Sequence, residues 1–334
     1  MPLSDLRFIA LQNWIARTLT KDAQIVLISG DASFRRYFRV THQEHHYIAM
    51  DSPQDLVPVA PFIALAQEYA RHSLLAPQVI AKESELGFLL LSDLGDTQLL
   101  SKLNQENVSH YYQQALGLLS KVATITQADG SPLPLYDGAF VRRELAIFSE
   151  WLIGHHLGLA LTEQEQTLIT SAFELLVDNA LEQPRVGMHR DFHSRNLMLC
   201  DGQMAVIDFQ DAVIGPITYD AVSLLRDCYI RWPDTLVDSL MQSHYRQMQA
   251  AGLLSSQISL EQYRRWFDLM GIQRHIKAAG IFCRLNYRDG KTGYMKDIPL
   301  TLQYIVDVAG AYPELRAFAH WLTQKVIPLM EQRR

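Results

Sequence analysis

Residues 187–215 read GMHRDFHSRNLMLCDGQMAVIDFQDAVIG, and this stretch decides the fold of the chain. A short apolar run is followed by a polar loop that contains Asp191, and Asn196 comes five positions later. The apolar runs LMLC and MAVI flank the turn residues Asp-Gly-Gln, which predicts a β-hairpin that leads directly into Asp208. A loop, a hairpin and a second loop in this order should bring Asp191, Asn196 and Asp208 to one edge of the fold.

These three side chains suit phosphoryl transfer to a hydroxyl group. One carboxylate beside the acceptor can take its proton, while an amide and a second carboxylate can hold Mg²⁺ against the phosphates of ATP. We therefore predict that Asp191 is the catalytic base. We predict that Asn196 and Asp208 are the metal ligands and also contribute to nucleotide binding.

The same stretch resembles the aminoglycoside phosphotransferase and choline kinase family. In that family His-Gly-Asp-x-His-x-x-Asn precedes Ile-Asp-Phe or Ile-Asp-Trp, and His193 matches the second histidine. Other segments closely resemble bacterial kinases that phosphorylate the anomeric hydroxyl of N-acetylmuramate and N-acetylglucosamine. Together with the end of the first stretch they span residues 30–291 and read GDASFRRYFRV, GFLLLSDLG, RRELAIFSEWL, VIDFQDAVIGPITYDAVSLLRD and IFCRLNYRDGK.

This resemblance implies an α+β, protein-kinase-like fold with two lobes, ATP and Mg²⁺ as cofactors, and a sugar 1-phosphate product that feeds cell-wall recycling. It also implies that Asp220, at the start of a helix, anchors the catalytic loop from beneath. We expect a β-rich nucleotide-binding lobe over residues 1–92 and a mostly helical catalytic and substrate-binding lobe over residues 93–334.

The pattern of apolar residues agrees with two such lobes. A leading helix is expected over residues 3–19, and a second helix should begin at Pro61. Strands are expected near residues 25–28, 37–40, 47–50, 78–81 and 88–91, and again near 186–188, 197–199 and 204–207. Helices are expected near residues 106–126, 138–157 and 163–182, the last with a capping box of Thr162 and Glu165.

The nucleotide contacts are predicted from the first lobe. Ser33 lies in a run of small residues where backbone N–H groups can reach a phosphate, and Arg35 follows it. Ser92 and Asp93 come directly after a strand, where the resemblance places the hinge whose backbone binds adenine.

The third strand lacks the lysine that kinase templates place there. It reads Tyr-Ile-Ala-Met-Asp over residues 47–51, so the phosphate clamp must come from elsewhere, and Arg35 or Arg36 is the candidate. Glu68 lies on the following helix, but without a lysine partner we expect it on a solvated face.

The acceptor contacts are predicted on the second lobe. An N-acetylated hexose needs polar groups for its hydroxyls, and Glu144 lies seven residues before Trp151, which predicts one helix face for both. The lactyl carboxylate of N-acetylmuramate would need a cation, which points to a late loop rich in Arg and Lys. The predicted substrate contacts are Glu144, His193, Arg195, Arg284 and Arg288.

The composition excludes several other classes. A net charge of −6 gives no basic surface for a nucleic acid, and no apolar run approaches the ~20 residues that span a bilayer. The three cysteines are scattered, which is typical of a reducing compartment, so a cytoplasmic protein with small-molecule partners is expected. The sequence does not define the oligomeric state.

Three alternatives remain open. His189, Asp191 and His193 alternate and could be a metal-binding strip of a hydrolase. The missing lysine is compatible with an inactive kinase-fold binding module. Within the kinases, the acceptor could be an aminoglycoside, choline or another small alcohol.

Overall fold

Discontinuous segments of the chain build two structural units. The structure is a computed structural model that describes residues 5–28 and 34–333. The first unit consists of Met1–Lys102, Ala128–Ser131 and Arg195–Asp211, and the second of Leu103–Gln127, Pro132–Ser194 and Ala212–Arg334. The predicted phosphate contact Ser33 lies outside the described residues.

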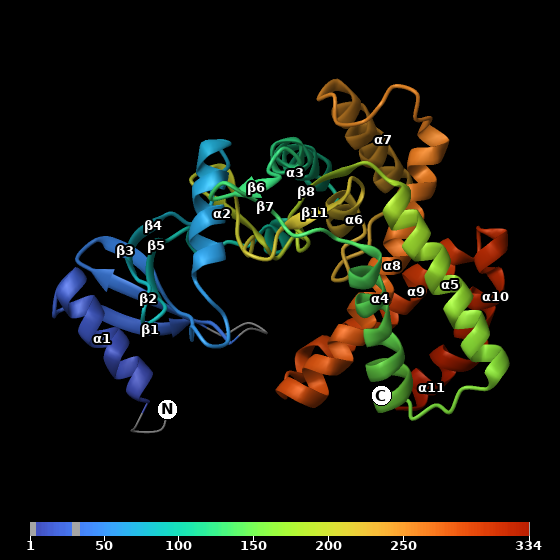
Figure 1. Cartoon of the computed structure of the whole chain (residues 1–334), viewed down its shortest axis with the longest axis horizontal. Helices are drawn as coiled ribbons and strands as arrows, with labels where there is room; N and C mark the ends of the chain where they lie inside the picture. The colour runs from blue at the N-terminus through green and yellow to red at the C-terminus, as the bar shows by residue number, and fades with distance from the viewer. Residues whose placement is uncertain (1–4, 29–33, 334) are drawn as a thin grey trace. The chain divides into compact units, whose positions relative to one another are not determined.

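An antiparallel sheet of five strands, in the order β1-β2-β3-β5-β4, is the centre of the first unit (Figure 1). The strands are β1 (Gln24–Ile28), β2 (Arg36–His42), β3 (His45–Asp51), β4 (Val79–Glu83) and β5 (Phe88–Ser92). Helix α1 (Leu6–Thr18) buries Leu11, Trp14 and Ile15 against apolar side chains of β2, β3 and β5, so this face of the sheet forms a core. Helix α2 (Ala60–Arg71) begins next to Pro61, as predicted.

The turn between β4 and β5 requires a glycine. Gly87 has φ +75°, and a Cβ at this position would lie 1.9 Å from the carbonyl oxygen of Ser52. The N–H of Ser52 also donates to the Gly87 carbonyl at 2.9 Å, so two backbone segments pass too close for any side chain.

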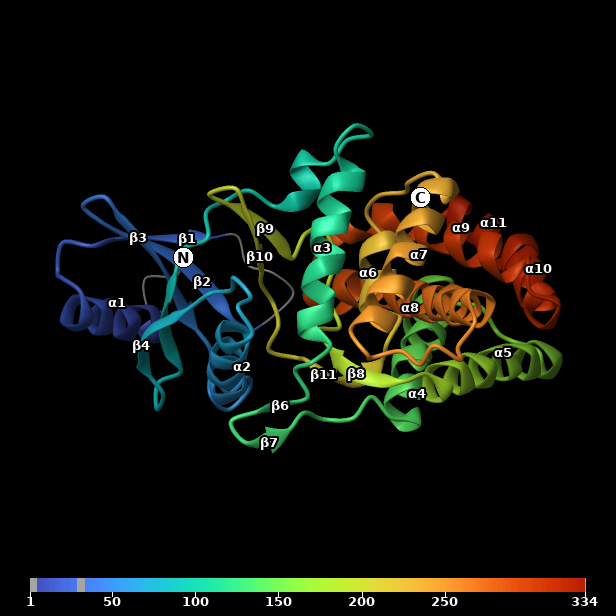
Figure 2. The ribbon, with the colours of Figure 1, turned by 90° about the horizontal axis from the view of Figure 1, so that it is seen from above.

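The predicted hairpin is formed by β9 (Leu197–Cys200) and β10 (Gln203–Val206) and belongs to the first unit (Figure 2). Bridges join Leu75 to Ala205 and Gln98 to Met198, close to the short helix η1 (Leu99–Lys102). Backbone bonds to segments before residue 100 therefore set the position of the hairpin, and with it the start of the segment that contains Asp208.

Helices dominate the second unit. The α-helices are α3 (Val108–Val122), α4 (Gly138–Ile147), α5 (Glu163–Glu182), α6 (Tyr219–Leu225), α7 (Asp234–Ala250), α8 (Leu260–Asp289), α9 (Ile298–Ala309), α10 (Arg316–Trp321) and α11 (Ile327–Gln332). Two π-helices, η2 (Phe148–His156) and η5 (Leu322–Val326), and two 3₁₀-helices, η3 (Thr292–Asp297) and η4 (Pro313–Leu315), complete the helical part. Strands β8 (Arg185–Met188) and β11 (Val213–Pro216) of this unit pair antiparallel. A further ladder joins β6 (Gln127–Ala128) to β7 (Ser131–Pro132), and its residues Ala128 and Ser131 belong to the first unit.

Helix α8 lies at the centre of the second unit (Figure 1). Most of its residues between Tyr263 and Leu285 are buried. It packs against α9, η2, α5, α6 and α4. A Cβ at Gly280 would lie 2.6 Å from the backbone of Ile147, so the glycine allows α8 to approach the end of α4 closely. A helix surrounded in this way is expected to be apolar on all sides, and the polar residues it does bury require partners.

Most predicted elements are confirmed, including α5 over residues 163–182 and its capping box. The prediction of one α-helix over residues 138–157 is wrong, because the chain changes to a π-helix at Phe148. The prediction of a late loop around Arg284 and Arg288 is also wrong. Both residues lie in α8, which continues to Asp289 and is capped by Gly290 in the left-handed conformation. Strand β11 was not predicted. In the described ranges, 5–28 and 34–333, no helix has the length and apolarity to cross a membrane.

Candidate active site

The loop that follows β8 contains Asp191, and the carboxylate of Asp220 fixes its beginning. Asp220 lies in the first turn of α6 and accepts the backbone N–H groups of His189 at 2.7 Å and Arg190 at 3.0 Å. The anchoring role predicted for Asp220 is confirmed by these two bonds. Burial raises the pKa of Asp220 to about 7, although the two N–H donors and nearby Arg274 oppose the shift.

A second carboxylate fixes the end of the same loop. Asp227, two residues after α6, accepts the backbone N–H of Ser194 at 3.0 Å and also the hydroxyl of Ser194. Its other oxygen accepts the N–H of Tyr229 at 3.1 Å. No role for Asp227 was predicted from the sequence. It lies seven residues after Asp220, so residues at both ends of one short helix support the loop.

Arg190 adopts a backbone conformation that is rare for a residue with a side chain, with φ +78°. The family run has glycine at this position, for which a positive φ costs little. Here the two N–H bonds to Asp220 hold the strained loop in place. The guanidinium of Arg190 lies over the ring of Phe140 and donates to Glu144 at 3.1 Å.

Glu144 is buried at the centre of a polar network. It accepts from Tyr136 at 2.6 Å and from Gln273 at 3.2 Å, and pairs with Lys277 at 2.8 Å. Burial alone would raise the pKa of Glu144, but the charges of Lys277 and Arg190 hold it below its ordinary value. These contacts place Glu144 behind the loop and engage both of its carboxylate oxygens.

Positive charges surround Asp191, which is partly buried in the same region. Burial would raise the pKa of Asp191, but Lys277 first, and then His193, Arg190 and Arg274, lower it to about 2. The carboxylate of Asp191 is therefore ionised at neutral and mildly acidic pH. Lys277 and Arg274 were missed from the sequence, although two cations buried in helix α8 indicate a polar network there.

In the first unit, Asn196 and Asp208 lie side by side. The amide of Asn196 donates to Asp208 at 3.3 Å, and its backbone carbonyl accepts the N–H of Ile207 at 3.0 Å. The other oxygen of Asp208 accepts from Gln210 at 2.7 Å, and the backbone of Asp208 is in the left-handed conformation with φ +66°. A carboxylate and an amide in contact supply the hard oxygen ligands that Mg²⁺ prefers, so the pair fits that ion.

Aromatic packing supports the next residue, Phe209. Its ring is fully buried and lies 5.0 Å from the ring of Phe62 and 4.8 Å from that of Tyr69, both on α2. Apolar contacts therefore fix the segment that carries Asp208 to helix α2 of the first unit.

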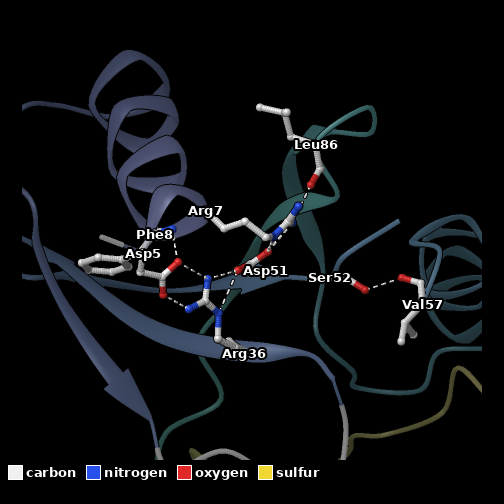
Figure 3. A network of polar contacts seen from close by, with 8 residues as sticks. All are labelled: Asp5, Arg7, Phe8, Arg36, Asp51, Ser52, Val57 and Leu86. Atoms are coloured by element: carbon white, nitrogen blue, oxygen red, sulfur yellow. Dashed lines mark hydrogen bonds and ion pairs between the residues drawn. The ribbon is translucent and has the colours of Figure 1, made fainter. Parts of the chain in front are cut away.

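The structure removes Arg36 from the candidates for the phosphate clamp. Its guanidinium donates to Asp51 at 2.9 and 2.5 Å and also to Asp5 (Figure 3). Arg7 donates to the same Asp51 at 3.0 Å and to the carbonyl of Leu86 at 2.8 Å. Asp51 is fully buried between two arginines, so the end of β3 is an ion-pair site that joins α1 to the sheet. Arg35 is buried and remains the candidate.

The other nucleotide candidates lie at the end of β5. Ser92 exchanges bonds with Gln78, whose backbone N–H donates to the serine hydroxyl at 2.9 Å. Asp93 accepts from Arg39 of β2 at 2.6 Å and from the N–H of Gly95 at 2.8 Å. Both side chains thus shape the segment after the strand.

The expectation of a solvated Glu68 is wrong. Glu68 is buried on α2 and pairs with Arg71 at 2.5 Å, one turn along the same helix. The missing lysine therefore does not leave the glutamate in water, because Arg71 pairs with it.

The predicted acceptor contacts fall in different places. The ring of His193 lies 5.5 Å from that of Tyr229, and Arg284 is half-buried on α8. Arg288 is exposed and donates twice to Asp289, at 2.8 and 2.9 Å. Arg195 is partly buried and belongs to the first unit, unlike the other four. The inference that Glu144 shares a face with Trp151 does not apply, because the π-helix changes the period between them.

The metal-strip alternative lacks support in the structure. In the part of the chain that the structure describes, no group of three or more His, Cys, Asp or Glu side chains could hold a metal ion.

A family model described as the phosphotransferase enzyme family matches residues 24–254. The chain belongs to this family. This phosphotransferase is 38% identical over 326 residues to N-acetylmuramate/N-acetylglucosamine kinase of Pseudomonas putida strain KT2440, covering 94% of this chain and 95% of that protein. A protein of the same name from Neisseria meningitidis serogroup B is 39% identical, with 92% and 93% coverage.

Solved structures support the same fold for the phosphotransferase. A Plasmodium vivax ethanolamine kinase matches with a TM-score of 0.65 at 11% identity, covering 93% of this chain and 89% of that one. The choline kinase LicA from Streptococcus pneumoniae matches with a TM-score of 0.59 at 13% identity, covering 91% and 100%. The predicted protein-kinase-like fold is confirmed.

Proposed function

We propose that this phosphotransferase moves the γ-phosphoryl group of ATP to the anomeric hydroxyl of N-acetylmuramate or N-acetylglucosamine and releases the sugar 1-phosphate and ADP. The observation that carries the proposal is the similarity, over more than nine tenths of the chain, to proteins named as kinases of these two sugars. The ionised Asp191 and the contact between the Asn196 amide and the Asp208 carboxylate support it.

In the proposed reaction, the anomeric oxygen forms a bond to the γ-phosphorus while the bond from that phosphorus to the β,γ-bridging oxygen breaks. The carboxylate of Asp191 accepts the proton of the anomeric hydroxyl. A carboxylate with a pKa of about 2 is a weak base, which suits a proton that moves late, after the bond to the leaving ADP is largely broken. Asp191 therefore acts mainly by orienting the hydroxyl, and Asp220 and Asp227 keep the loop that carries it in position.

We assign Mg²⁺ to the oxygens of Asn196 and Asp208. The ion would neutralise negative charge on the phosphates of bound ATP. Gln210 holds the Asp208 carboxylate in one orientation, and burial of Phe209 fixes the backbone behind it.

For the nucleotide, we assign Ser33 and Arg35 to the phosphates and the backbone around Ser92 and Asp93 to adenine. The reaction would take place in the cytoplasm, where ATP is available. His193 and Arg195 remain proposed acceptor contacts, since both follow the base within four residues.

A panel of acceptors tests the proposal. Purified protein with ATP and Mg²⁺ is incubated with N-acetylmuramate, N-acetylglucosamine, kanamycin, choline or homoserine, and ADP release is followed. We expect turnover with the two amino sugars. Turnover with kanamycin or choline alone would assign a different acceptor to the same fold, and no turnover with any of the five would support an inactive binding module.

A further inference from the structure

Arg284 is a charged residue of the second unit with a buried nitrogen that has no hydrogen-bond acceptor among the described residues. Its side chain is half-buried on α8, and its Nε is buried without a hydrogen-bond acceptor. Among residues 5–28 and 34–333, no carboxylate pairs with it. Burial lowers the pKa of this guanidinium and nearby Arg288 lowers it further, so the charge is held at an energetic cost.

Nearby acidic groups do not compensate for this charge. Asp289 gives both oxygens to Arg288, and Glu150 of the π-helix η2 is exposed. A half-buried arginine fork with no protein acceptor is suited to an external anion, and a carboxylate matches its geometry with two parallel bonds.

Arg284 lies on the helix that also carries Lys277, the cation with the largest effect on the proposed base Asp191. It is seven residues after Lys277 on the same face of α8, about 10 Å further along the helix axis. Lys277 pairs with Glu144, which in turn binds the side chain of Arg190, the residue before Asp191.

An aromatic path makes a second connection to the catalytic loop. The ring of Phe282, two residues before Arg284, lies 6.1 Å from that of Tyr229, and Tyr229 lies 5.5 Å from His193. The ring of Tyr294 stacks on Phe282 at 5.6 Å. The turn of α8 that carries Arg284 is thus joined through one tyrosine to the loop of Asp191.

We propose that Arg284 is a specificity-determining residue that binds the lactyl carboxylate of N-acetylmuramate. The two proposed acceptors share their N-acetylated ring and differ by this lactyl ether, which sits two ring carbons from the anomeric centre. The inference rests on the proposed function and deepens it: Arg284 distinguishes an anionic from a neutral acceptor at the same site.

The test compares kcat/KM for the two sugars in four proteins: wild type, Arg284→Gln, Arg284→Lys and the control Arg265→Gln. Arg265 lies on the same helix and pairs with Glu314 at 2.5 Å, so its loss removes one cation away from the proposed contact. For Arg284→Gln, the ratio of N-acetylmuramate to N-acetylglucosamine efficiency should fall by about 10- to 100-fold, the worth of a charged hydrogen-bonded pair. Arg284→Lys should lose part of the preference, and Arg265→Gln should keep it.

The substrate supplies a second arm that does not depend on the folding of a variant. With wild-type protein, the lactyl amide of N-acetylmuramate should react as poorly as N-acetylmuramate does with Arg284→Gln. With Arg284→Gln, the amide should bring no further loss, because charge on either partner matters only in the presence of the other.

Several results would overturn the inference. In Arg284→Gln, a ratio of N-acetylmuramate to N-acetylglucosamine efficiency within about threefold of wild type would do so. An equal loss of efficiency for both sugars, or a raised KM for ATP in place of the acceptor effect, would also do so. In wild type, equal rates with N-acetylmuramate and its lactyl amide would contradict the inference as well. If the wild-type protein phosphorylates neither sugar, it is the proposed function that fails.

Discussion

The two halves of the reactive motif belong to different structural units and are held in place by different forces. In the second unit, hydrogen bonds to the carboxylates of Asp220 and Asp227 hold the loop that contains Asp191. The buried ion pair of Lys277 and Glu144 lies next to this loop. In the first unit, Asp208 is oriented by neutral amides, and Phe209 packs between aromatic rings. The comparison teaches that the half with the proposed base depends on charge, and the half with the proposed metal ligands on close packing.

The largest expected effect is on the metal side. We expect Asp208→Asn to reduce Mg²⁺-dependent turnover by about 10³-fold, because charge stabilisation is the main catalytic term in phosphoryl transfer. Asparagine tolerates the positive φ of this position, so the backbone should be kept. Asp201→Asn, in the hairpin turn and also at positive φ, is the matched control for a steady-state ADP assay. Full activity of Asp208→Asn would exclude the metal assignment.

On the base side, we expect Asp191→Asn to lower kcat by about 10²-fold or more while ATP binding stays intact, since the amide keeps the shape but cannot accept the proton. Rapid-quench turnover and calorimetric titration with ATP and Mg²⁺ measure the two quantities separately. Asp178→Asn, an exposed site on α5, serves as control. An unchanged kcat would remove Asp191 from the mechanism.

The dependence on charge makes the base side sensitive to pH. With a pKa of about 2, Asp191 stays ionised in wild type, so it adds no acid limb to kcat/KM between about pH 4 and pH 6. Lys277→Met removes the first of the cations that favour the carboxylate, the pKa of Asp191 rises, and protonated Asp191 cannot accept the proton. An acid limb should therefore enter this range, whereas Lys277→Arg should suppress it. A variant profile parallel to that of wild type would contradict the electrostatic account.

The smallest effect on turnover is expected from a smaller side chain at Phe209, next to the proposed metal ligand Asp208. Phe209→Leu should lower the free energy of unfolding by about 1–2 kcal/mol through lost ring contacts, and turnover by less than about tenfold, with no change in the pH profile. Urea unfolding measures the first quantity. Phe34→Leu, at a residue that is 64% exposed, should leave stability unchanged. A loss of turnover that depends on pH in Phe209→Leu would contradict the proposed difference between the two halves.

Local patterns were sufficient to predict much of the fold. The hairpin before Asp208 follows from two apolar runs and a turn, and helix α5 from its capping box. The role of Asp220 followed from the family resemblance, and the two N–H bonds bear it out. These features depend on neighbours in the chain or on a motif that keeps its spacing.

Other features depend on contacts between distant segments and could not be predicted in the same way. Arg36 could point toward phosphates or toward α1, and only the fold places Asp5 and Asp51 around it. The π-helix over Phe148–His156 has apolar residues at spacings that also suit an α-helix. Lys277 lies within the buried part of α8, where a charged residue requires a partner. That partner is Glu144, which is distant in the sequence and could not be identified from it.

The most direct test of the account is the position of the transferred phosphate. In wild-type protein with ATP, Mg²⁺ and N-acetylmuramate, ³¹P NMR of the product should show phosphorus coupled to the anomeric proton, and the signal should be lost with Asp191→Asn. A phosphate on another hydroxyl of the sugar, or the same anomeric product formed at an undiminished rate by Asp191→Asn, would contradict the account.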